Sequence, residues 1–148
     1  MTAHFCEYGE MKLGQLVLEV VAPMEQPKER WGHVWTAEIV PELAESGRRN
    51  VERLGYADRV TYLEADASDG LECLGPFDLI IVTSAAPEVP LGLVNQVKVG
   101  GILLIPVGGA QFGQELIRIS KNVDGGLSRE NLGGVVFVPM KGKRGWKI

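Results

Sequence analysis

Two carboxylates stand where apolar, strand-like segments of the sequence end. Glu38 lies near the end of residues 34–39 (VWTAEI), and Asp66 follows residues 60–63 (VTYL). Both segments are short and rich in β-branched and aromatic residues, which is typical of strands buried in a sheet. A carboxylate at such a position can accept hydrogen bonds from both hydroxyls of a ribose, and Asp66 could accept one from the amino group of an adenine. The two positions therefore indicate a nucleotide-binding edge of a sheet.

Each carboxylate also has a purely structural interpretation. Glu38 could be a solvated residue at a strand end, and Asp66 could cap the next turn, a role that Ser68 could fill equally well. A further strand-like segment, residues 77–83, leads into the sequence TSAAP at positions 83–87. Small residues there would let a substrate backbone approach closely, whereas the proline could simply set a tight turn. The order of these segments is more informative than any one of them.

Strand-like and helix-like segments alternate along the chain. The spacing of apolar residues after Pro41 predicts a helix that stops at Gly55, and a shorter helix is expected at residues 90–97. The expected strands are residues 16–21, 34–39, 60–63, 77–83, 102–109, 115–120 and 134–139. This pattern predicts an α/β fold with a mostly parallel sheet and an antiparallel edge. Ligands of such sheets bind beyond the carboxyl ends of the strands.

Composition sets the frame for these segments. A chain of 148 residues, 45% hydrophobic and 23% charged, predicts one globular domain over residues 1–148. The net charge of −4 gives no electrostatic reason to bind nucleic acid or an anionic membrane, so the basic ending KGKRGWK is expected to be a solvated tail. Cys6 and Cys73 match no metal spacing, and no apolar run has the length of a membrane span or signal peptide. We expect a cytoplasmic protein with reduced thiols.

Longer motifs carry a resemblance to a known family. They are VWTAEIVPELAESGRRNVERLGYADRV, DLIIVTSAAPEVP, VKVGGILLIPVG, QEL and ENLGGVVFVPMKGKRGW, between residues 34 and 146. Together with KLGQLVLEV at residues 12–20, they resemble the protein-L-isoaspartate O-methyltransferase family. The resemblance implies a Rossmann-like methyltransferase fold and S-adenosylmethionine as the cofactor. It also implies methyl transfer to the carboxylate of L-isoaspartyl residues in damaged proteins.

The resemblance also implies roles for single residues. The cofactor would be bound by Glu38 at its ribose and by Asp66, with Ala65 before it, at its adenine. The residues that would bind the isoaspartyl peptide are Thr83, Ser84, Ala85 and Gln114. The reaction requires that the two reactants are held in line and shielded from water. No strong base is needed, because the substrate carboxylate is already a nucleophile.

The chain departs from the family between its first two strand-like segments. The family has a glycine-rich loop, G-x-G-x-G, directly after the first strand, where backbone amides and a helix N-terminus receive the amino-acid part of the cofactor. Residues 21–31 of this chain contain no glycine and two prolines. An internal deletion that removed the loop and the first crossover helix would explain this sequence. The family's N-terminal segment, which closes over the substrate, is expected to be missing as well.

Three classes of function are consistent with the sequence. The first is an isoaspartyl methyltransferase, fully active or impaired by the missing loop. The second is a non-catalytic binding protein on the same fold, which could form a homo-oligomer through a sheet face left uncovered by the lost helix. The third is another nucleotide-dependent enzyme, such as a dehydrogenase with Glu38 on the ribose. Binding of S-adenosylhomocysteine would distinguish the first class from the second.

Overall fold

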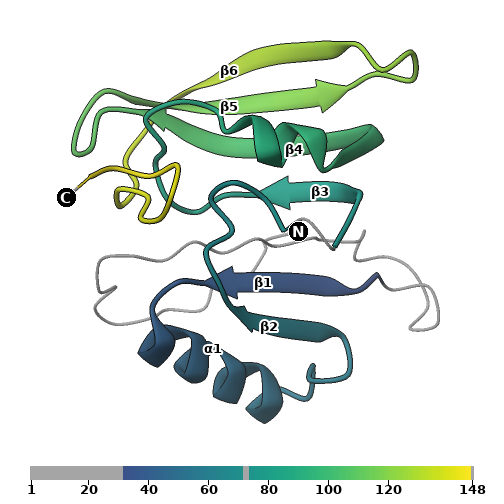
Figure 1. Cartoon of the computed structure of the whole chain (residues 1–148), viewed down its shortest axis with the longest axis vertical. Helices are drawn as coiled ribbons and strands as arrows, with labels where there is room; N and C mark the ends of the chain where they lie inside the picture. The colour runs from purple at the N-terminus through teal and green to yellow at the C-terminus, as the bar shows by residue number, and fades with distance from the viewer. Residues whose placement is uncertain (1–31, 72–73, 148) are drawn as a thin grey trace.

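The computed structural model describes residues 32–71 and 74–147 (Figure 1). In chain order the elements are β1 (Val34–Glu38), α1 (Pro41–Arg53), β2 (Val60–Glu64), β3 (Phe77–Ile81), α2 (Leu91–Asn95), β4 (Val97–Gly108), β5 (Gln114–Lys121) and β6 (Leu127–Val135). None of the helices in these residues is long and apolar enough to cross a membrane. The predictions for residues 1–31, including the strand at 16–21 and the missing glycine loop, lie outside the described residues.

The strands form a two-stranded and a four-stranded sheet. Strands β1 and β2 pair in parallel, and the second sheet has the order β3-β4-β5-β6. Pairing is parallel between β3 and β4 and antiparallel from β4 through β6. The carboxyl ends of β1, β2, β3 and β4 all lie at one side of the molecule, the left in Figure 1. This arrangement confirms the predicted α/β fold with an antiparallel edge.

Helix α1 follows from its sequence. Pro41 occupies the first turn, where its fixed φ favours helix and its missing N–H costs nothing. Gly55, at φ +78°, lies just past the end, as predicted. The exposed face carries ion pairs of Arg48 with Glu45 and Glu52, and of Arg49 with Glu45. These pairs support the helix only weakly, because water screens them.

The core lies mainly in the larger sheet and beneath α2. Its largest fully buried apolar side chains are Ile80, Leu93, Leu103, Ile105, Ile117 and Met140. The two sheets meet through Trp35 of β1 and Phe77 of β3, whose ring centroids are 5.8 Å apart. His33 also packs against Trp35, with the ring centroids 4.6 Å apart and the rings tilted by 60°. His33 is half-buried and shares a 2.7 Å hydrogen bond with Thr61.

Two strands differ from the sequence prediction. Strand β6 covers Leu127–Val135, whereas residues 134–139 were expected. The turn at residues 122–126 closes tightly, with a 2.7 Å hydrogen bond from the Asn122 N–H to the Gly126 carbonyl, so pairing with β5 resumes directly at Leu127. Nearly all of β6 is exposed, and its apolar and polar residues do not alternate, so the sequence lacks the pattern that marks a strand. Strand β4 begins at Val97, before the two glycines at which a turn was expected.

Candidate functional site

The carboxyl ends of the strands are crossed by the C-terminal segment, which we define as residues 138–146. In Figure 1 it is the yellow loop to the left of β3, and Pro139 and Met140 pair with Ala85, which follows β3. Its Met140 is fully buried, and Trp146 turns back to donate its backbone N–H to the Met140 carbonyl at 2.9 Å. The predicted site residues at the strand ends therefore lie beneath or beside this segment.

Glu38, the last residue of β1, is 2% exposed. Its Oε1 accepts the Val40 N–H at 2.9 Å. Its Oε2 is buried and has no hydrogen-bond partner in the described part of the chain. Burial raises the pKa of this carboxyl, and the hydrogen bonds from Val40 and Ile39 and the charge of Lys141 offset only part of the effect. A buried acceptor of this kind fits a ligand that brings its own donor.

Thr36 is a site candidate that sequence reasoning missed. It lies two residues before Glu38 and so on the same face of β1. Its side chain is buried, and its Oγ1, too, has no partner among the described residues. The strand alternation could have revealed it, because every second residue before Glu38 shares its face.

Asp66 and Ala65 lie directly after β2. The Ala65 N–H donates to the Glu38 carbonyl at 3.1 Å, which joins the ends of β1 and β2. Asp66 Oδ1 accepts the Ser68 N–H at 2.9 Å, and Oδ2 accepts the Lys143 N–H at 2.7 Å. Burial raises the pKa of Asp66, but the hydrogen bonds from Ser68 and Lys143 together outweigh it and leave the pKa lowered. Asp66 therefore forms the expected turn, and as an ionised, exposed acceptor it can still meet a ligand donor.

The loop after β3 is held inside the protein. Ser84 is 1% exposed, and its Oγ lacks a partner among residues 32–71 and 74–147. The Ala85 N–H donates to the Val138 carbonyl at 2.7 Å, and the Ala85 carbonyl accepts from the Met140 N–H and from Trp146 Nε1. Thr83 is partly buried. The structure brings these predicted substrate residues to the C-terminal segment, and their contact with a peptide stays a prediction.

Gln114 opens β5 and is 3% exposed. Its Nε2 donates to the carbonyls of Gly109 and Phe137, both at 3.0 Å, and its Oε1 accepts the Phe137 N–H at 2.6 Å. All of these contacts hold backbone at the carboxyl end of β4 and ahead of the C-terminal segment. Gln114 thus supports the neighbourhood of the substrate loop.

The basic ending is exposed to solvent, as expected, but it is also docked on the residues that follow β2. Lys143 and Arg144 both pair with Asp69 at 2.9 Å, and the Arg144 N–H donates to Ser68 Oγ at 3.0 Å. The side-chain hydrogen bonds from Lys143 and then Arg144 lower the pKa of Asp69. The docking was not predicted, because the sequence analysis counted the charges of these residues and did not include their backbone donors.

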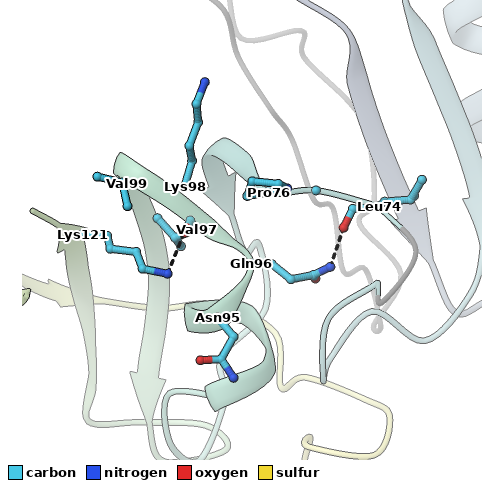
Figure 2. Close-up of a pocket in the computed structure, with 9 residues that line it drawn as sticks. Leu74, Pro76, Asn95, Gln96, Val97, Lys98, Val99 and Lys121 are labelled. Carbon is cyan, nitrogen blue, oxygen red and sulfur yellow. Dashed lines mark hydrogen bonds between the residues drawn. The ribbon is translucent and has the colours of Figure 1, made fainter. Parts of the chain in front are cut away.

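A hollow of about 460 Å³ opens at the opposite end of the larger sheet, where β3 and β4 begin. Figure 2 shows Lys121 bonded to the Val97 carbonyl and Gln96 bonded to the Leu74 carbonyl, so these two polar side chains already have partners. Lys98 pairs with Asp78 at 2.8 Å. The carboxyl end is the better candidate site, because buried polar atoms without partners gather there.

The site can supply hydrogen-bond acceptors to a ligand. In the described ranges, no three His, Cys, Asp or Glu side chains are close enough to hold a metal ion. Glu38 and Asp66, at the ends of two neighbouring strands, can accept hydrogen bonds from the hydroxyls and the amino group of a nucleoside.

The sequence profile of the protein-L-isoaspartate(D-aspartate) O-methyltransferase family matches residues 1–145. The chain belongs to this family.

Relatives in the family support the assignment along the whole chain. A protein-L-isoaspartate O-methyltransferase of Hyperthermus butylicus is 44% identical over 99% of this chain, and that of Pyrococcus horikoshii is 40% identical over 99%. A third, of Thermococcus onnurineus, is 46% identical over 77% of the chain. The chain covers 66%, 69% and 52% of these relatives' own lengths, respectively.

Solved structures of the family share the fold. A protein-L-isoaspartate O-methyltransferase of Plasmodium falciparum, crystallised in complex with S-adenosyl-L-homocysteine, matches 74% of this chain and 52% of its own, with a TM-score of 0.64 and 27% identity. Another structure of a protein-L-isoaspartate O-methyltransferase matches 76% of this chain and 35% of its own, with a TM-score of 0.65 and 28% identity. The Rossmann-like methyltransferase fold is therefore that of this chain.

The alignments also bear on the missing loop. The match to the Hyperthermus butylicus relative extends over 161 aligned positions, although this chain has only 148 residues. That relative therefore carries residues within the aligned region that have no counterpart here. An internal deletion is thus supported, and its position between the first two strand-like segments stays a prediction.

Proposed function

We propose that this chain transfers a methyl group from S-adenosylmethionine to the carboxylate of L-isoaspartyl residues in damaged proteins. Membership of the family supports the reaction class. The observation that carries the proposal is Glu38, whose Oε2 is buried at the end of β1 without a partner in the described residues. An unpaired buried carboxylate oxygen is costly, so a ligand hydroxyl that pairs with it gains binding energy.

The residues present fit the adenosine part of the cofactor. Glu38 Oε2 would accept a ribose hydroxyl, while Oε1 stays fixed by the Val40 N–H. Asp66 would accept the amino group of the adenine, and Ala65, bonded to the Glu38 carbonyl, keeps the two strand ends together. When bound, S-adenosylmethionine supplies an electrophilic methyl group and leaves as S-adenosylhomocysteine.

The chain's own residues would orient the peptide and exclude water. Thr83, Ser84 and Ala85 follow β3 at the same side of the molecule as Glu38. Ser84 Oγ is buried without a partner among the described residues, so it would bond a substrate atom. Gln114 fixes the backbone beside this loop. Positioning of this kind can supply most of the rate, since the attacking carboxylate needs no base.

The test begins with calorimetric titration of S-adenosylhomocysteine into the folded protein. We expect micromolar binding, which Glu38→Ala and Asp66→Ala should weaken to the millimolar range. Glu64→Ala is the matched control, because Glu64 is an exposed acid at the end of β2, opposite Glu38 in the register, and should bind normally. Absence of binding at millimolar ligand, by protein shown to be folded, would overturn the cofactor site.

A methylation assay then addresses the substrate. Transfer to an isoaspartyl peptide, and not to the same sequence with normal aspartate, is the expected result. Cofactor binding without any transfer would favour the non-catalytic alternative. The resemblance to methyltransferases along the whole chain does not favour that alternative, nor a different nucleotide-dependent enzyme.

A further inference from the structure

The Asp66 carboxylate is held from a point far along the chain. Its Oδ2 accepts the Lys143 N–H at 2.7 Å across 77 positions of sequence, while Oδ1 accepts the nearby Ser68 N–H. Only one of these two contacts is a local turn. The direction of the carboxylate therefore depends on where the C-terminal segment places the peptide group between Gly142 and Lys143.

Gly142 is the residue on which this placement depends. Its φ of +104° lies in the region that side chains rarely adopt, and it turns the next N–H toward Asp66. A Cβ built on Gly142 would lie 2.6 Å from Asp66 Cγ and 2.7 Å from Oδ2, and closer still to Oδ1. The carboxylate thus packs directly on the glycine backbone, at a distance that no side chain permits.

We propose that Gly142 is a positioning residue that acts through Asp66 and sets the direction in which its carboxylate presents acceptors to the cofactor's adenine. The adenine part rests on the proposed function, whereas the orientation of Asp66 does not. Neighbouring contacts hold the C-terminal segment in place. Asp69 pairs with both Lys143 and Arg144, and Ser68 Oγ accepts the Arg144 N–H. The carboxylate is fixed between its own turn and an anchored segment.

The first measurement needs no ligand. Carbon-13 NMR would follow the titration of the Asp66 carboxyl, assigned by its loss in Asp66→Asn. In the wild type we expect titration below the ordinary range for aspartate, because both oxygens accept backbone N–H groups. Gly142→Ala should move the titration upward, toward the ordinary value. Gly133→Ala is the matched control, since Gly133 has a similar φ of +114° and open space around its Cβ position, and it should change nothing.

The second measurement is a double-mutant cycle on S-adenosylhomocysteine affinity. Gly142→Ala should weaken binding on the order of tenfold or more, the range expected for loss of a hydrogen bond to a charged group. In the Asp66→Ala background the same change should have almost no effect, because the group through which Gly142 acts is gone. An equal loss in both backgrounds would mean that Gly142 supports the fold alone, and would overturn the proposal.

The two measurements separate the two proposals. A wild type that binds no S-adenosylhomocysteine, but whose Asp66 titration shifts in Gly142→Ala, overturns the cofactor assignment and leaves the positioning role intact. An Asp66 titration unchanged in Gly142→Ala overturns the positioning role whatever the ligand does. If Gly142→Ala does not fold, Gly142→Asn is the second variant, because asparagine tolerates positive φ better while its side chain still meets Asp66.

Discussion

The side-chain amide of Gln114 bonds to both backbone polar groups of Phe137. The Phe137 N–H donates to Oε1 at 2.6 Å, and Nε2 donates to the Phe137 carbonyl at 3.0 Å. These two hydrogen bonds extend the pairing of β5 with β6 to residue 137, where the chain leaves β6 and turns toward the C-terminal segment. A side chain thus replaces the strand partner that the backbone of residue 137 would otherwise need.

Gln114→Ala should destabilise the protein by about 2–4 kcal/mol. The substitution leaves the N–H and carbonyl of Phe137 and the carbonyl of Gly109 without their partner, and buried groups left unpaired cost about 1–3 kcal/mol each, reduced where water can reach them. Urea unfolding measures the change. Gln111→Ala, in the exposed loop nearby, is the control and should be nearly neutral. A Gln114 variant as stable as this control would contradict the bonding scheme.

The affinity for S-adenosylhomocysteine should fall as the pH drops through the raised pKa of Glu38. Burial raises this pKa above 4.5, and the protonated side chain has lost much of its capacity to accept ribose hydroxyls. Glu38→Gln should bind more weakly and show no such pH dependence. Calorimetric titrations at a series of pH values test this. An equally steep pH dependence in the variant would assign the titration to another group.

The raised pKa of Glu38 also predicts how the free energy of unfolding changes with pH. The folded state holds the Glu38 proton more tightly than the unfolded chain does. Its contribution to the free energy of unfolding is therefore fully present below the ordinary pKa and is lost as the pH rises through the raised value. Glu38→Gln should remove this slope from a series of urea unfolding curves, and a slope that persisted in the variant would contradict the shift.

Ser84→Ala should separate stability from function. The Ser84 hydroxyl is buried without a partner in the described chain, so its removal should stabilise the protein by about 1 kcal/mol. If the hydroxyl bonds the isoaspartyl substrate, kcat/KM should fall while the affinity for S-adenosylhomocysteine stays the same. Ser128→Ala, at an exposed position of β6, should change neither. A stabilised Ser84 variant with full activity would remove Ser84 from the substrate site.

The positions of the strand ends at Glu38 and before Asp66 could be predicted from sequence, because a strand is indicated by the residues of that segment alone. Apolar runs before Glu38 and Asp66 predict parallel strands, and parallel strands bring their carboxyl ends to one edge. Joining Ala65 to the Glu38 carbonyl follows from the same pairing. Strand β6 was misplaced because both of its faces are exposed, which leaves no alternation to detect.

The supporting contacts could not be predicted, because their partners are distant. Gln114 bonds to Phe137 across 23 positions, and Lys143 bonds to Asp66 across 77. A local pattern carries no information about which backbone group a buried amide will meet. The docking of the basic ending was missed for this reason. Its backbone N–H groups bind Asp66 and Ser68, in addition to the ion pairs that its charged side chains make with Asp69.

Helix α2 packs closely against the backbone of Asp69, and a substitution at Gly92 can test this contact. A Cβ on Gly92 would lie 2.5 Å from the carbonyl carbon of Asp69 and closer still to its oxygen, and backbone cannot rotate away as a side chain could. Alanine in a helix is otherwise better than glycine by about 1 kcal/mol, but overpacking against backbone costs about 1–3 kcal/mol or more. We therefore expect Gly92→Ala to lose about 2 kcal/mol in urea unfolding. Gly134→Ala is the control, since its Cβ would meet only the Gln114 carbonyl oxygen at 4.0 Å. A stabilised Gly92 variant would show that α2 and the segment carrying Asp69 do not pack this closely.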